Sequence, residues 1–169
     1  AGYADGGGGT IIQESLDRGS FETFFLPDGM YADSLTKTFG TQINGSFGAS
    51  AGTDSPGDAT FKSLFADAGY EYNVYAGEYY DAAALIMLAM QAAGSSSSSD
   101  LKAHVMDVAN APGEKIYPGE LAKAMKILAG GGDVDYVGAS AVELIGPGES
   151  GGSYLQYEVQ NGKFETVKY

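Results

Sequence analysis

The residues that could do chemistry in this chain are few, and most of them are carboxylates, tyrosines and glycines. The sequence has no cysteine and a single histidine, His104. Cysteine nucleophiles, disulfides and thiolate metal sites are therefore excluded, and one histidine alone cannot build a histidine-based metal site. The spacing around His104 suggests no nucleophile–base pair, so the sequence predicts no catalytic residue, no metal centre and no cofactor.

A run of glycines, Gly6 to Gly9, follows Asp5 and precedes a predicted helix. Free backbone N–H groups at such a helix start can bind an anion. The spacing is neither G-x-G-x-x-G nor a Gly-Lys-Ser/Thr loop, and the nearest basic residue, Arg18, lies at the far end of the helix. A phosphate site in an α/β enzyme, with Asp5 or Asp28 as acid or base, is thus an alternative function, beside the simpler interpretation of a plain loop.

Composition limits the partners. The chain has 169 residues, which is about one domain at ~150 residues per domain. Its net charge of −13 argues against nucleic acid and anionic membrane surfaces, and it suits a protein that is soluble and extracytoplasmic or one that is simply very soluble. The sequence begins without an initiator Met or a signal-peptide pattern, and we interpret it as a mature product or a fragment.

The strongest helical signal is the stretch 79–94. Ala, Leu, Met and Gln are good helix formers, and Gly94 stands where a C-terminal cap belongs. Positions 82–90 carry no polar side chain, so the helix is predicted to be buried over most of its surface. It is shorter than the roughly 20 apolar residues of a membrane span, which makes it a core helix.

Glycine, proline and serine stretches separate the other predicted elements. Helices are expected at 10–18, 32–39, 59–68, 101–109 and 118–128, and strands at 21–26, 42–50, 134–137 and 142–145. Asn161-Gly162 predicts a hairpin over 154–167. The opening order of helix, strand, helix and strand predicts an α/β fold with a parallel sheet. Two stretches, 50–58 and 146–152, have the composition of linkers or crossovers.

Several stretches, taken in order, carry a likeness to a known family. They are Gly2-Tyr3 before Ile11-Ile12-Gln13-Glu14, Phe25-Leu26-Pro27-Asp28-Gly29 before Asp33-Ser34-Leu35, Tyr80-Asp81-Ala82-Ala83-Ala84-Leu85, the run from Gly130 to Ser140, and the closing hairpin. Together they resemble the C-terminal part of a type I periplasmic solute-binding protein of the branched-chain amino acid (leucine/isoleucine/valine) class of ABC transporters.

The resemblance implies an architecture. The family has two Rossmann-like, three-layer α/β lobes joined by three crossovers, with solute bound in the cleft between them. Residues 1–50 would belong to the second lobe, and 51–146, including the central helix 79–94, to the first. Residues 147–169 would return to the second lobe and end in a C-terminal β-hairpin. The N-terminal part of such a receptor would be missing from this sequence.

The resemblance also implies a site. The family grips an amino-acid ligand with an acidic residue that meets the ammonium group, and with a nearby tyrosine. By motif match, the acidic residue falls on Asp28 and the tyrosine on Tyr3. The family usually has Glu at the position of Asp28, which implies a different ligand or cleft. Tyr31 could add an aromatic wall or a cation–π contact. The structural alternatives are a turn residue for Asp28 and packing tyrosines for Tyr3 and Tyr31.

The expected function is therefore binding and not catalysis. A periplasmic receptor would bind an amino acid or similar small polar solute and deliver it to an ABC permease. A third interpretation is a structural or oligomer-forming module. Parts of two lobes that lack partner strands would expose apolar surface, from which self-association is expected.

Overall fold

The computed structural model describes residues 2–70, 72–146 and 148–169 and consists of two compact units. Unit 1 comprises Ala1–Gly52 and Ser153–Tyr169, and unit 2 comprises Thr53–Gly152. The chain therefore passes from unit 1 to unit 2 and back again. The last predicted segment, 147–169, begins at a residue that lies outside the described ones. Each unit has a hydrophobic core of its own.

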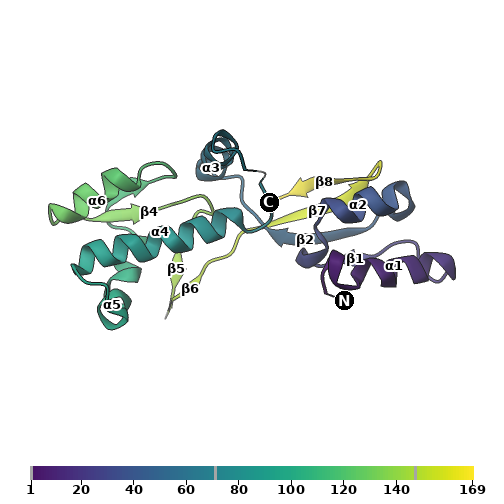
Figure 1. The fold of residues 1–169 in the computed structure, drawn as a ribbon, viewed down its shortest axis with the longest axis horizontal. Helices are drawn as coiled ribbons and strands as arrows, with labels where there is room; N and C mark the ends of the chain where they lie inside the picture. The colour runs from purple at the N-terminus through teal and green to yellow at the C-terminus, as the bar shows by residue number, and fades with distance from the viewer. Residues whose placement is uncertain (1, 71, 147) are drawn as a thin grey trace. The chain divides into compact units, whose positions relative to one another are not determined.

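Unit 1 places helices beside one mixed sheet (Figure 1). Its elements are η1 (Ala4–Gly6), α1 (Gly8–Asp17), β1 (Phe25–Leu26), η2 (Asp28–Met30), α2 (Asp33–Phe39), η3 (Gly40–Ile43), β2 (Phe47–Ala51), β7 (Tyr154–Gln160) and β8 (Lys163–Lys168). The strand order is β1-β2-β7-β8. The β1–β2 pair is parallel, whereas β7 pairs antiparallel with both β2 and β8. The α/β class and the C-terminal hairpin are thus confirmed.

Alternation along β7 explains how unit 1 is packed. Leu155, Tyr157 and Val159 are buried, and the residues between them are more exposed. Because successive side chains of a strand point to opposite faces, one face of the sheet receives these three. They pack with Ile12 of α1 and with Leu35 of α2. Both helices therefore cover the same face of the sheet.

Two predicted strands of unit 1 are wrong in extent. The strand expected at 21–26 is confined to Phe25–Leu26, because these are the residues that pair with β2. The strand expected at 42–50 begins later, at Phe47, because the chain first makes the 3-10 turn Gly40–Ile43, whose Ile43 is fully buried. Tertiary pairing and burial outweigh local strand propensity here.

Unit 2 is mainly helical. Its elements are α3 (Pro56–Asp67), α4 (Ala76–Ala93), α5 (Ser98–Ala109), β3 (Glu114–Ile116), α6 (Leu121–Ala129), β4 (Val134–Tyr136), β5 (Leu144–Ile145) and β6 (Glu149–Ser150). Strands β3 and β4 form a parallel pair, and β5 and β6 an antiparallel one. The short strand β3 was not predicted. The helix expected from residue 118 begins at Leu121, after a turn.

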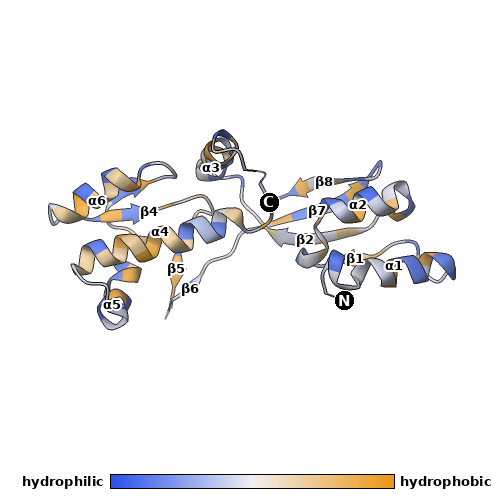
Figure 2. Cartoon of the chain, in the orientation of Figure 1, coloured by the Kyte–Doolittle hydropathy of each residue, from blue (hydrophilic) through white to orange (hydrophobic). Residues whose placement is uncertain are grey.

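The central helix, α4, ends at Gly94 in the left-handed conformation, as predicted. Figure 2 shows apolar residues along it. Its Leu85 and Leu88 pack with α5, α6 and β4 in the core of unit 2. The prediction that α4 is buried over most of its surface is wrong, since Ile86 is 53% exposed and Met87 is 41% exposed. The helix meets its neighbours in unit 2 along one side, which leaves an outward face that is also apolar.

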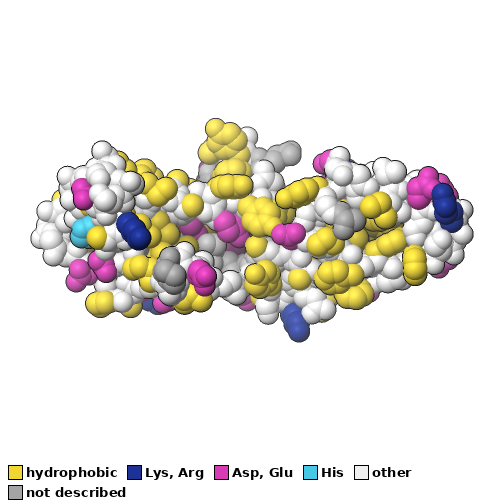
Figure 3. Space-filling model, turned by 90° about the horizontal axis from the view of Figure 1, so that it is seen from below, with side chains coloured by type: hydrophobic (Ala, Val, Ile, Leu, Met, Phe, Trp, Pro, Cys, Tyr) yellow, Lys and Arg dark blue, Asp and Glu magenta, His cyan; other side chains and the backbone are white. Residues whose placement is uncertain are grey.

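We call this outward side of α4 the outer α4 face. It consists of exposed residues spaced along the helix: Tyr79, Ala82, Ala83, Ile86, Met87, Met90 and Gln91. Figure 3 shows further hydrophobic side chains that reach the surface of both units on the side drawn. Among the described residues, no helix is both long enough and apolar enough to cross a membrane.

Candidate functional site

The loop that carries Asp28 follows β1 directly. Strand β1 ends at Leu26, and η2 begins at Asp28, so this turn lies at the carboxyl end of the parallel β1–β2 pair. Open α/β sheets bind ligands at that end of their strands. The Asp28 side chain is exposed, and its Oδ1 accepts the N–H of Gly29 at 2.7 Å. Asp28 thus shapes its own turn while its carboxylate reaches solvent.

Tyr3 lies against the same turn. A Cβ built on Gly29 would come within 2.7 Å of the Tyr3 ring, so the ring passes close over the Gly29 backbone and a larger residue would displace it. Tyr3 itself is 71% exposed. The structure therefore brings Tyr3 beside the turn that carries Asp28, with most of the tyrosine accessible.

Tyr31 takes a different position, in the packing of unit 1. Its ring centroid lies 4.6 Å from that of Tyr157 and 4.8 Å from that of Phe164. The residue is only partly exposed and packs against the core of unit 1. Its ring contacts thus support the turn from the core side. This is the role of a packing tyrosine, which was the alternative to an aromatic wall for the ligand.

Tyr157 was not singled out from the sequence, yet it fixes the end of β1. Its hydroxyl donates to the carbonyl oxygen of Leu26 at 2.7 Å, and the carbonyl of Pro27 lies at 3.4 Å. Burial raises the pKa of Tyr157 above its ordinary value, and the nearby Tyr31 and Asp28 raise it further. Tyr157 therefore stays a neutral donor. The signal was its inward position in an alternating strand, where a tyrosine hydroxyl needs a partner.

The glycine run has a structural explanation. Gly7 is the N-cap of α1 with φ 99°, and Gly8 and Gly9 form the first turn of the helix. The N–H groups of Gly6 and Gly8 donate to the Tyr3 carbonyl at 3.0 and 3.1 Å. A Cβ on Gly8 would collide with the Met30 side chain, so close packing requires glycine there.

Charge also argues against a phosphate site at this run. A hollow of about 250 Å³ beside it is lined in part by Asp5, whose carboxylate would repel a phosphate. The guanidinium of Arg18 is occupied by Glu14, with the Nη2–Oε2 distance at 2.9 Å. The alternative of a phosphate-binding enzyme is therefore weakened, because the N–H groups of Gly6 and Gly8 are already used within the protein and the nearest cation is paired.

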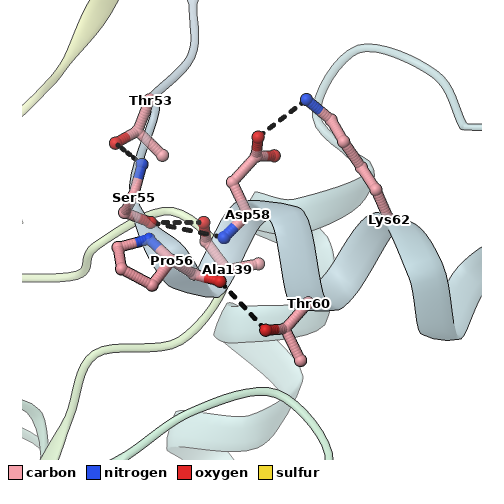
Figure 4. A network of polar contacts seen from close by, with 7 residues as sticks. All are labelled: Thr53, Ser55, Pro56, Asp58, Thr60, Lys62 and Ala139. Atoms are coloured by element: carbon pink, nitrogen blue, oxygen red, sulfur yellow. Dashed lines mark hydrogen bonds and ion pairs between the residues drawn. The ribbon is translucent and has the colours of Figure 1, made fainter.

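Unit 2 has a polar cluster at the N-terminus of α3 (Figure 4). Ser55 is the N-cap, and its Oγ accepts the N–H of Asp58 at 3.3 Å. The same hydroxyl donates to the carbonyl oxygen of Ala139 at 3.4 Å. Within the helix, Lys62 Nζ lies 2.7 Å from Asp58 Oδ2. The cluster thus attaches the start of α3 to the loop that follows β4.

The loop after β4 is also held by Asp81. This residue of α4 is 2% exposed, and its carboxylate accepts hydrogen bonds from the loop. The sequence pointed to Asp81 only as part of a family resemblance. A stronger signal was available, because a lone charged residue in an apolar helix is rarely buried without partners.

Metal-binding groups are absent from the part of the chain that the structure describes, where no three His, Cys, Asp or Glu residues gather. His104 lies on α5, and its Nδ1 is 3.8 Å from a carboxylate oxygen of Asp107. Among residues 2–70, 72–146 and 148–169, no third metal-ligating side chain joins this exposed pair in such a group.

Comparison with known proteins identifies the fold. No protein-family model matches the chain, and no curated protein matches it. The solved leucine binding protein LivK from Thermotoga maritima is similar with a TM-score of 0.69 at 18% identity, over 98% of this chain and 41% of LivK. An ABC transporter substrate-binding protein from Desulfitobacterium hafniense, also solved in complex with Leu, gives a TM-score of 0.55 at 17% identity, over 98% of this chain and 42% of that one.

The chain therefore adopts part of a type I periplasmic binding protein fold. It spans about two fifths of the length of these solved structures. The α/β class inferred from the sequence and the predicted resemblance in fold are confirmed by this similarity.

Proposed function

We propose that this chain belongs to the solute-binding component of an ABC-type importer and binds an amino acid or similar small polar solute. Unit 1 would be part of the second lobe and unit 2 part of the first, with the solute in the cleft between lobes. A further N-terminal part would complete the receptor, which would work outside the cytoplasm, in the periplasm, with an ABC permease as its partner.

The observation that carries this proposal is the position of Asp28. An exposed carboxylate stands at the carboxyl end of β1, and the accessible ring of Tyr3 lies on the next residue of the turn. A carboxylate in this place can accept a charge-assisted hydrogen bond from an ammonium group. The solved structures with this fold carry the names of leucine and substrate-binding proteins, which supports binding in place of catalysis.

Isothermal titration of the full-length protein with the amino acids tests the proposal. We expect one or more of them to bind, and we expect Asp28→Asn to weaken that binding. Loss of a hydrogen bond to a charged group costs about 1.5–3 kcal/mol, which corresponds to roughly 10- to 150-fold in Kd. The carboxylate that is lost is proposed to contact the ligand's ammonium group. An amino acid should therefore lose more affinity than its analogue without the amino group.

Asp33→Asn is the matched control. Asp33 is an exposed carboxylate in the first turn of α2, 3.7 Å from Lys37 Nζ, so the same change of charge falls nearby but outside the turn. It should leave the Kd unchanged. Absence of heat with every amino acid, amide and small organic acid would contradict the proposed function, and equal Kd values for Asp28→Asn and wild type would exclude Asp28 from it.

A further inference from the structure

Asp81 is a buried carboxylate that the proposed solute contacts do not use. Its Oδ1 accepts the hydroxyl of Tyr136 and the N–H of Ala139, each at 2.8 Å. Its Oδ2 accepts the N–H of Ser140 at 2.7 Å and the Ser140 hydroxyl at 2.6 Å. Burying a carboxylate is costly unless hydrogen bonds satisfy it, and these donors do so on both oxygens. Burial, then the Asp81 charge, raise the pKa of Tyr136, which stays a donor.

The loop after β4 is shaped around this carboxylate. Gly138 has φ 62° and Ala141 has φ 54°, so left-handed residues flank Ala139 and Ser140. Successive N–H groups beside a left-handed residue form a concave anion site, or nest. A Cβ on Gly138 would collide with the Asp81 carboxylate. The nest is therefore filled by a side chain of the protein's own α4.

The same loop also contacts the start of α3. The carbonyl oxygen of Ala139 accepts the Ser55 hydroxyl at 3.4 Å (Figure 4). A Cβ on Gly57 would collide with the carbonyl oxygen of Gly138, so the two backbones touch. Ser55 follows closely on Thr53, where unit 2 begins. The contacts made by Asp81 thus reach the segment by which the chain enters unit 2.

We propose that Asp81 is a positioning residue for solute binding: it holds the loop 137–141 and, through that loop, sets the N-terminus of α3 and the entering segment. This inference rests on the proposed function. The loop lies at the carboxyl end of the parallel β3–β4 pair, and α/β sheets bind ligands at that end of their strands. The competing role for Asp81 is stability of unit 2 without any effect on the solute.

Hydrogen exchange in the full-length protein tests the positioning directly and needs no solute. Asp81→Asn keeps the volume but presents an NH₂ group to backbone N–H donors, so the loop must move. We expect the amides of Ala139, Ser140 and Asp58 to exchange at least about tenfold faster, as for the loss of hydrogen bonds to a charged group. Amides of α6 should be unchanged. If the loop amides exchange faster and the Asp58 amide does not, Asp81 does not set α3 and the proposal fails.

Asp107→Asn is the matched control, since its side chain is 73% exposed on α5, and it should leave every one of these amides unchanged. Ser140→Ala removes only the hydroxyl of one donor and keeps the Ser140 N–H. If Asp81→Asn does not fold, Ser140→Ala is used in its place. The exchange rates of the same loop amides and of the Asp58 amide are then measured, and we expect them to rise.

The Kd for the amino acids separates positioning from stability. With both variants folded by circular dichroism, we expect the Kd of Asp81→Asn to rise about tenfold and that of Ser140→Ala to rise less. A lower unfolding midpoint with an unchanged Kd would overturn the proposal in favour of a structural role. If wild type binds no amino acid, the proposed function fails, and exchange at Asp58 alone decides whether Asp81 sets α3.

Discussion

At the residue scale, the Tyr157 hydroxyl offers a test of how the turn with Asp28 is fixed. Tyr157→Phe would leave the buried carbonyl oxygen of Leu26 without the donor that lies 2.7 Å away. The Leu26 carbonyl stays paired in the β1–β2 ladder, so we expect the free energy of unfolding to fall by about 0.5–1.5 kcal/mol, the usual net contribution of one hydrogen bond. Urea unfolding followed by circular dichroism measures the change.

Tyr154→Phe provides the control in the same strand. Tyr154 also lies in β7 but is 64% exposed, so removal of its hydroxyl should change the free energy of unfolding by less than about 0.5 kcal/mol. Equal effects of the two substitutions would show that the Tyr157 hydrogen bond does not stabilise the end of β1.

The role of a single residue was predictable where a local sequence motif indicates it. It was not predictable where the role depends on a partner that is distant in the sequence. The Pro-Asp-Gly turn marked Asp28, and the structure does place it in a turn after a strand. Tyr157 meets Leu26 across more than a hundred residues of sequence, and Asp81 meets Ser140 across 59. No spacing rule within the chain connects such residues, because the fold brings them together.

At the element scale, α4 has two sides that should respond differently to truncation. Leu88 is fully buried in the core of unit 2, whereas Ile86 lies on the outer α4 face. Leu88→Ala should lower the free energy of unfolding by about 2–5 kcal/mol through lost burial and the cavity left behind. Ile86→Ala removes exposed surface and improves helix propensity, so it should cost less than about 1 kcal/mol.

Thermal and urea unfolding of the two variants provide the comparison. Similar losses for Leu88→Ala and Ile86→Ala would mean that the outer α4 face is covered in solution, as the sequence alone had predicted. The sequence could not decide whether the outer α4 face is covered. An apolar run shows that a helix is able to be buried, but it does not show which neighbouring elements are present to cover it.

Helices were more predictable than strands for a physical reason. Gly40 and Gly94 end α2 and α4 at the residues expected, since a glycine cap is encoded locally. The strand β2 depends instead on its pairing with β1 and β7. Local propensity placed its start too early, in the residues that form η3, because strand pairing is a tertiary property.

At the scale of the whole molecule, two features oppose each other. The net charge is −13, which makes separate copies repel one another. The outer α4 face carries no charged side chain, and exposed apolar surface favours association. Repulsion between copies acts over about 10 Å at 0.1 M salt and about 3 Å at 1 M, while apolar contact is not weakened by salt. Salt should therefore shift the balance towards association.

We accordingly expect the isolated 169-residue chain to self-associate, and more so as salt is added. Light scattering should give a mass above 17.4 kDa that rises between about 0.05 M and 1 M NaCl. Replacing Ile86 and Met90 together by serine should lower the mass at high salt, because it removes apolar surface from the outer α4 face. Gln91→Ser, a polar change on the same face, is the control and should leave the mass unchanged. A mass of 17.4 kDa at both salt concentrations would contradict self-association, since repulsion is then screened and the apolar face still fails to bind a second copy.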